Sequence, residues 1–144
     1  MFEFVAVDQS EIILGLQQAA HATLQALTGE LASLRLSGAE LNVLAVLADG
    51  RARAVGELAA ATATRPTTLT SVLDRLADKG HVVRAPTPAD RRSYAISLTG
   101  DGRRAAAAVD AAVRRLEQRA LADLSDTDLA GFRAVLAGLL AAAR

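Results

Sequence analysis

Apolar residues at helical spacing mark the first third of the chain. They recur three or four positions apart at Ile13, Leu16, Ala20, Leu24, Leu27, Leu31 and Leu34. This spacing places them on one face and predicts an amphipathic helix over about residues 8–34. A helix of this length in a globular chain favours packing against a partner chain.

A second helix is predicted from Ser37 to about Asp49–Gly50. Ser37 and Glu40 form the S-x-x-E pattern of a capping box, in which each side chain accepts a hydrogen bond from a free backbone N–H at the helix start. The apolar face of this helix is formed by Leu41, Leu44 and Leu47.

Two short helices and a turn come next. The helices cover about residues 55–61 and 66–79, and the turn lies around 62–64. Pro66 suits the first position of a helix, where its missing N–H costs no hydrogen bond, and Gly80 suits the position after a helix end. The order helix, turn, helix is typical of a helix-turn-helix, although an ordinary helical hairpin has the same spacing.

A pair of strands is predicted after these helices. Val82-Val83 forms a short strand, and residues 85–90 form a turn, because their two prolines cannot continue a hydrogen-bonded ladder. Apolar and polar residues then alternate over 93–99, which predicts a second strand. Two strands joined by a basic loop directly after a helix-turn-helix indicate a wing.

Two further helices are predicted, over about 102–121 and from Ser125 onward. Ser125 and Asp128 resemble a weak capping box. The last helix carries an apolar stripe made of Leu129, Phe132, Val135, Leu136, Leu139 and Leu140. The stripe can pack within the chain, but one small winged domain cannot cover both long terminal helices, which favours a dimer interface.

The predicted architecture is therefore a mainly α fold with a small β-wing. We interpret residues 1–144 as a single domain in which 37–101 form a winged helix-turn-helix DNA-binding region. Residues 8–36 and 102–144 supply the N- and C-terminal helices of a dimerisation region.

Composition argues against several classes of protein. The chain has no cysteine, which excludes disulfides, thiolate metal sites and cysteine-based redox sensing. Its two histidines show no metal-ligand spacing, and we find no phosphate-binding glycine loop or nucleophile–base constellation. We therefore expect no enzyme activity, cofactor or metal. The lack of a long apolar run and of a signal peptide predicts a cytoplasmic protein without a membrane partner.

Charge is unevenly distributed, although the net charge is zero. Residues 1–50 carry six acids and one Arg, whereas residues 65–104 carry eight basic and four acidic residues. The positive charge is concentrated where the helix-turn-helix and wing are predicted, as in a nucleic-acid-binding protein. An ordinary solvated surface remains the alternative interpretation of charge alone.

The second helix of the helix-turn-helix carries the candidates for DNA contact. A helix in the major groove contacts base edges from its N-terminal, solvent-facing side. Hydroxyl groups can bind bases or phosphates, and Thr methyl groups can pack on thymine methyl groups. The candidates are Arg65, Thr67, Thr68, Thr70 and Ser71, with Arg75 better placed for the DNA backbone.

The wing adds Arg84, Asp90, Arg91 and Arg92 as candidates. An Arg on a loop tip can enter the minor groove, where narrow A·T-rich stretches concentrate negative potential. Asp90 fits such a loop if it pairs with a neighbouring Arg and holds that side chain extended.

These motifs resemble the MarR-type (multiple antibiotic resistance) regulators. Residues 90–102, DRRSYAISLTGDG, are similar to the wing signature of that family, an Asp-x-Arg followed by Leu-Thr and a Gly. Residues 69–80, LTSVLDRLADKG, are similar to its recognition helix and the Gly that ends it. The order of helices agrees over nearly the whole chain.

The resemblance implies a homodimer that binds a pseudo-palindromic double-stranded DNA operator, most often as a repressor. Asp90 and Arg92 would be the wing pair, and Arg75 a backbone contact. It further implies a small aromatic or phenolic effector that releases DNA. No motif marks the effector site, for which helix position alone suggests His21, Leu24, Leu44 and Val113. The alternative function is a winged module for protein–protein contact without DNA binding.

Overall fold

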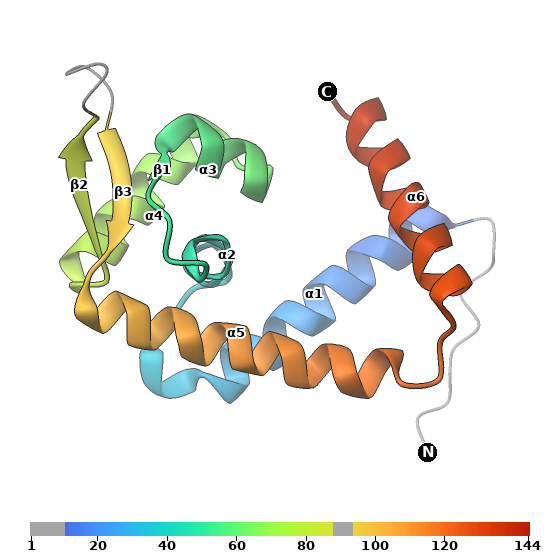
Figure 1. The fold of residues 1–144 in the computed structure, drawn as a ribbon. Helices are drawn as coiled ribbons and strands as arrows, with labels where there is room; N and C mark the ends of the chain where they lie inside the picture. The colour runs from blue at the N-terminus through green and yellow to red at the C-terminus, as the bar shows by residue number, and fades with distance from the viewer. Residues whose placement is uncertain (1–10, 88–93) are drawn as a thin grey trace. The chain divides into compact units, whose positions relative to one another are not determined.

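The computed structural model of the chain describes residues 11–87 and 94–144, and it divides into two compact units, residues 1–112 and 113–144. The elements in chain order are α1 (Ile12–Glu30), η1 (Ala32–Leu34), α2 (Gly38–Leu47), β1 (Arg53–Ala54), α3 (Val55–Thr62), α4 (Pro66–Asp78), β2 (Val82–Pro86), β3 (Tyr94–Leu98), α5 (Gly100–Leu121) and α6 (Asp126–Ala142) (Figure 1). The predicted mainly α fold with a small β-wing is confirmed.

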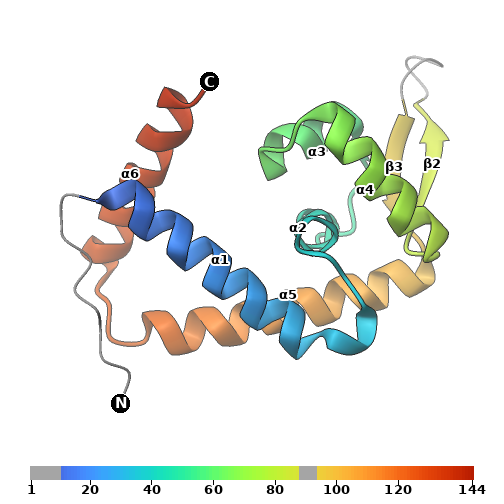
Figure 2. The ribbon, with the colours of Figure 1, turned by 180° about the vertical axis from the view of Figure 1, so that it is seen from behind.

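Helices α2, α3 and α4 pack on one another and form the core of the first unit (Figure 2). Burying one such leucine contributes roughly 1.5–3 kcal/mol. The fully buried side chains here are Leu41, Leu44, Leu47, Leu58, Leu69, Leu73 and Leu76. The turn between α3 and α4 passes through Ala63 in the left-handed conformation, with φ of 50°. Its N–H bonds the carbonyl of Ala60, as at other helix ends of this kind.

The wing strands belong to an antiparallel sheet with the order β1-β3-β2. Val82 pairs with Leu98, and Pro86 pairs with Tyr94. The prediction that residues 85 and 86 belong to the turn was therefore wrong. Strand β2 lies at the edge of the sheet, and proline is tolerated on edge strands because they lack a neighbour on one side.

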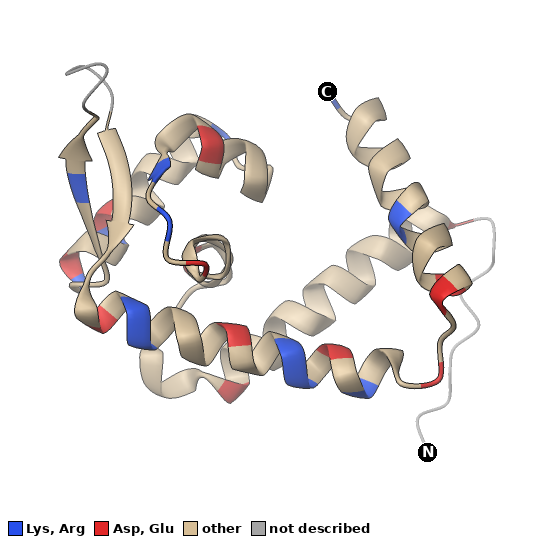
Figure 3. Ribbon diagram, in the orientation of Figure 1, with Lys and Arg blue, Asp and Glu red and all other residues tan. Residues whose placement is uncertain are grey.

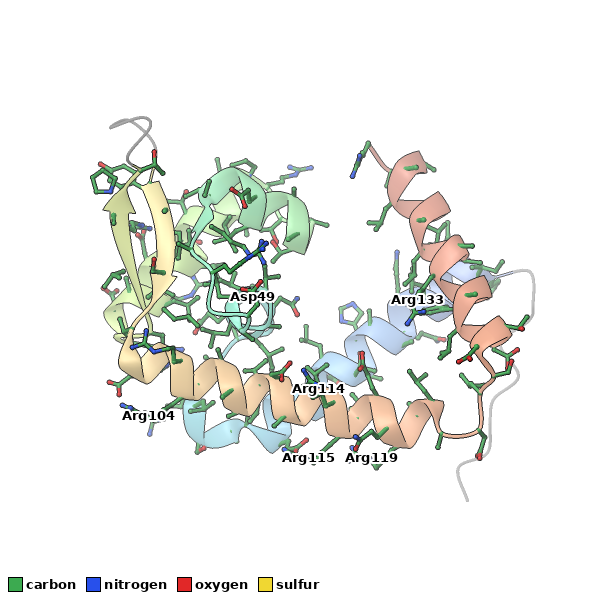
Figure 4. All side chains as sticks on the ribbon, viewed as in Figure 1. Asp49, Arg104, Arg114, Arg115, Arg119 and Arg133 are labelled. Carbon is green, nitrogen blue, oxygen red and sulfur yellow. The ribbon has the colours of Figure 1, made fainter. Side chains whose placement is uncertain are left out.

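Strand β1 was not predicted, because two residues show no periodicity. It pairs with β3 through Arg53 and Ile96. Asp49, which lies just after α2 (Figure 4), places its Oδ2 2.6 Å from Nη2 of Arg53. The backbone N–H of Arg51 and the nearby Arg side chains hold the pKa of Asp49 below its usual value.

Helix α1 is shorter than the predicted helix over 8–34. It ends at Glu30, directly after Gly29, a residue with low helix propensity. The chain then continues through the short helix η1. Arg35 then adopts a left-handed conformation with φ of 52°. The change of direction keeps Leu31 and Leu36 buried on both sides of the turn.

The start of α5 is fixed to the end of α4 by a close backbone contact. The hydroxyl of Thr99 accepts a hydrogen bond from the N–H of Gly102 and donates one to the carbonyl of Gly80. A Cβ at Gly102 would overlap the carbonyl oxygen of His81, so this position has no room for a side chain. Thr99 and Gly102 of the wing signature thus have a structural role in this chain.

The second unit contains the end of α5 and all of α6. Ser125 and Asp128 form a complete capping box: the Asp128 N–H donates to the Ser125 hydroxyl at 3.1 Å, and the Ser125 N–H donates to the Asp128 carboxylate at 3.0 Å. Helix α6 has no buried residue, and three of its large apolar side chains, Phe132, Val135 and Leu140, are exposed.

Candidate nucleic-acid interface

Helix α4 separates polar and apolar residues onto two faces. One face is buried in the core through Leu69, Val72, Leu73 and Leu76. The other is exposed and contains all six candidates on this segment: Arg65, Thr67, Thr68, Thr70, Ser71 and Arg75. Arg65 is the residue that precedes the first turn, and Pro66 occupies the first helical position as predicted. The helix therefore offers a polar surface that begins at its N-terminus.

Two hydroxyl groups on this face are already hydrogen-bonded as donors. The Thr70 hydroxyl donates to the carbonyl of Pro66 at 2.9 Å, and the Ser71 hydroxyl donates to the carbonyl of Thr68 at 2.9 Å. In this state their oxygens can only accept further hydrogen bonds. The acceptors match the exocyclic amino groups of adenine and cytosine in the major groove.

An ion pair links the wing to α4. Nη2 of Arg84, on β2, lies 2.7 Å from Oδ1 of Asp74, on α4. Arg84, a predicted DNA contact, thus has a partner within the protein, and its side chain is 35% exposed. Sequence reasoning missed this role of Asp74, because the ten-residue separation is not a spacing that marks a contact.

A second charged cluster joins α4 to α2. Glu40 is 2% exposed, and its Oε1 lies 3.3 Å from Nε of Arg75 while its Oε2 lies 2.5 Å from Nζ of Lys79. Burial alone would raise the pKa of Glu40, but the hydrogen bonds and charge of Lys79, with hydrogen bonds from Ser37 and Arg75, lower it overall.

The capping box predicted for Ser37 and Glu40 is therefore only half present. The hydroxyl of Ser37 accepts a hydrogen bond from the Glu40 N–H at 3.2 Å, as expected. The Glu40 carboxylate is instead turned to Arg75 and Lys79. Two charged partners outweigh one backbone N–H, because hydrogen bonds between ionised groups are the stronger kind.

A hollow of about 420 Å³ lies between α4 and the wing, lined by Val55, Thr70, Leu73, Arg84 and Tyr94. Thr70 and Arg84 were predicted site residues, whereas Val55 and Tyr94 were not. The alternation in β3 predicts that Tyr94 shares the face of Ile96, but it does not reveal that Tyr94 is half-exposed. The predicted wing residues Asp90, Arg91 and Arg92 lie outside the described residues.

The predicted effector contacts fall in different places. His21 and Leu24 line a shallow hollow of about 160 Å³ on α1, together with Gln17 and Ala20. Leu44 is fully buried in the core, so its side chain has no surface to offer a ligand. Val113 is the first residue of the second unit and is half-buried.

Residues 11–87 and 94–144 show neither a metal site nor a membrane-spanning helix. In these ranges no group of His, Asp and Glu side chains could hold a metal ion. No helix in them is long and apolar enough to cross a membrane.

Similar proteins agree with the winged architecture. Residues 36–93 match the model of the MarR family. A putative transcriptional regulatory protein for the hcr operon of Thauera aromatica is 35% identical over 98 residues, which cover 68% of this chain and 57% of that protein. The chain spans less than three fifths of the length of the curated relatives it matches.

Solved structures extend the likeness over more of the chain. CouR from Rhodococcus jostii RHA1, bound to p-coumaroyl-CoA, has a TM-score of 0.79 and 27% identity, with 90% of this chain and 92% of that chain covered. The transcriptional repressor CouR bound to a 23-mer DNA duplex has a TM-score of 0.69 and 27% identity, with 92% of each chain covered. The winged helix-turn-helix of this chain is that of the MarR family of transcriptional regulators, whose model matches residues 36–93.

Proposed function

We propose that this regulator is a repressor that binds a pseudo-palindromic operator as a homodimer and is released by a small aromatic or phenolic ligand. The observation that supports DNA binding is the polar face of α4. Its Arg, Thr and Ser side chains are exposed, and the opposite, apolar face is buried. An operator lies on the chromosome, so the proposed activity implies a cytoplasmic protein.

Helix α4 is proposed to enter the major groove. Thr67, Thr68, Thr70 and Ser71 contact base edges, and Arg65 and Arg75 contact phosphates. Arg84, which forms an ion pair with Asp74, contacts the DNA backbone in the region between α4 and the wing. In the wing, Arg91 and Arg92 approach the flanking minor groove, with Asp90 holding Arg92 extended.

The terminal helices are proposed to form the homodimer. Helix α1 carries no Lys, Arg, Asp or Glu before Glu30 (Figure 3), and Ile12, Ile13 and Leu14 at its start are each about half exposed or more. Helix α6 exposes Phe132, Val135 and Leu140. Apolar helix faces of this kind favour an interface, and a two-fold dimer favours a palindromic operator.

An effector is proposed because a relative binds one: CouR was solved with p-coumaroyl-CoA. The hollow beside His21 and Leu24 supports α1 as one wall of the site, and Val113 stays a candidate. Leu44 is withdrawn, since it is fully buried. Binding of the effector would change the separation of the two recognition helices and so release DNA.

The test is a mobility-shift titration on the DNA upstream of the regulator's own gene, with random DNA as competitor. Thr70→Ala and Ser71→Ala should lower operator affinity more than random-DNA affinity, because base contacts carry sequence preference. Thr23→Ala, an exposed hydroxyl on α1, is the matched control. Equal losses on both DNAs would reject base contact by α4, and no preference in the native protein would reject the proposed function. A panel of aromatic acids and phenols then tests release.

A further inference from the structure

The buried carboxylate of Glu40 does not lie at the helix start, where its sequence pattern predicts it, but against Arg75 and Lys79. Among the described residues it is the one charged side chain classed as buried. As the third residue of α2, it could have turned to the free N–H at the helix start, as its sequence pattern predicts. It points into the protein instead, where a carboxylate without partners is costly.

Both oxygens of Glu40 are bound to α4. Oε1 faces Nε of Arg75 and Oε2 faces Nζ of Lys79. The two cations are four residues apart, so they lie one above the other on the same side of α4. Because these two contacts are one turn apart on α4, they fix two quantities relative to α2: the position of α4 along its own axis and its rotation about that axis.

The same cluster reaches the segment that follows α1. Nζ of Lys79 also donates to the carbonyl of Arg35 at 2.6 Å. Arg35 is the left-handed residue between η1 and α2. The C-terminal end of α4 is therefore held by a carboxylate on α2 and by a backbone carbonyl before it.

Arg75 is at once part of this cluster and a proposed DNA contact. Its Nε–H is taken by Glu40, while its side chain is 51% exposed. A guanidinium has four further N–H donors in a fixed plane. Glu40 thereby sets the direction in which those donors point, and its negative charge opposes the approach of any phosphate.

We propose that Glu40 is a positioning residue for DNA discrimination: it aligns Arg75 and α4 for the operator and weakens the attraction of Arg75 for phosphates of other DNA. This inference rests on the proposed function. It predicts that the ratio of operator affinity to random-DNA affinity depends on a carboxylate at position 40.

The test measures both affinities by fluorescence anisotropy, with the upstream DNA fragment and a random duplex of the same length. Glu40→Gln should bind random DNA more tightly, because one negative charge beside Arg75 is gone, and should lose roughly tenfold in the affinity ratio, the equivalent of one charge-assisted hydrogen bond. Glu57→Gln removes the same charge from an exposed position on α3 and should leave the ratio near that of the native protein.

Glu40→Asp distinguishes the effect of the position of the carboxylate from the effect of its charge. It keeps the carboxylate but is one methylene shorter, so it should lower the ratio without tightening random-DNA binding. It also carries the test if Glu40→Gln does not fold. In an Arg75→Gln background, Glu40→Gln should have a smaller effect on the ratio, because only the contact of Glu40 with Lys79 is then left to lose.

Three results would overturn the proposal: an unchanged ratio in both Glu40 variants, a parallel loss on both DNAs that follows the loss of folded protein in thermal unfolding, or a full effect of Glu40→Gln without Arg75. The failure of the proposed function is a different result, because then the native protein itself shows no preference for the upstream fragment.

Discussion

Three consecutive residues of α4 have three different environments. Asp74 pairs with Arg84 of the wing, Arg75 pairs with Glu40 of α2, and Leu76 is fully buried. Leu69, Leu73 and Leu76 recur at helical spacing, which predicts that Leu76 lies on the buried face. This spacing could not predict the partners of the charged residues, because Glu40 and Arg75 are 35 residues apart and either charge could have remained in water.

Acid should weaken the fold through Glu40. Its pKa lies below the ordinary 4.5 in the folded chain, so the ionised form stabilises the fold above that pH, and the contribution is lost as pH falls through the lowered pKa. The melting temperature of the native protein should therefore fall more between about pH 7 and about pH 3 than that of Glu40→Gln, as thermal unfolding at matched ionic strength would show. Equal falls in the two proteins would contradict this role.

Arg92→Ala should weaken operator binding by about 1–3 kcal/mol, the loss expected for one arginine contact. The oligomeric state should not change, because the proposed dimer contacts come from the exposed apolar side chains of α1 and α6 and not from the wing. A mobility-shift titration measures the loss, and Arg144→Ala removes the same charge at the end of the chain. Native affinity in Arg92→Ala would reject the wing contact.

Among the elements, helix starts were predicted best because their signals are local. Pro66 begins α4, and Ser125 caps α6, as their sequences indicate. The end of α1 and the strand β1 were missed. Their positions depend on the burial of Leu31 and Leu36 and on the pairing of Arg53 with β3, which involve distant parts of the chain.

Ser125→Ala should destabilise α6 by about 1 kcal/mol, because it removes the acceptor for the Asp128 N–H. The Ser125 N–H also holds the pKa of Asp128 below its usual value, so the two halves of the box support each other. Hydrogen exchange of α6 amides measures the effect, and Thr127→Ala is a control within the same turn. Unchanged exchange in Ser125→Ala would show that the cap contributes nothing.

For the whole molecule, the order of the α-helices and of the two wing strands followed from the sequence, whereas η1, β1 and the division into residues 1–112 and 113–144 did not. Periodicity predicts that α5 and α6 have apolar positions, but not whether those positions are covered. In the structure α6 has no buried residue, and α5 has buried residues only up to Ala112. The exposed apolar side chains of α6 are the basis of the dimer proposal.

Phe132→Glu should convert the proposed dimer into a monomer. A charge at a side chain that is 54% exposed costs the isolated chain little, whereas in an apolar interface it is unpaired and costly. Light scattering should show a mass near 14.9 kDa instead of twice that value. The control is Arg133→Glu, which introduces glutamate at a neighbouring position that already carries a charged side chain (Figure 4). This variant should stay dimeric. A dimeric Phe132→Glu would exclude this face from the interface.

The close contact at Gly102 has an evolutionary consequence. Every replacement of this glycine by another amino acid adds at least a Cβ, which the carbonyl of His81 excludes. In saturation mutagenesis selected for repression, position 102 should therefore tolerate no replacement, while the exposed neighbours Asp101 and Arg103 tolerate many. The residues proposed to contact DNA can thus change during evolution, whereas this glycine cannot change unless the start of α5 moves first.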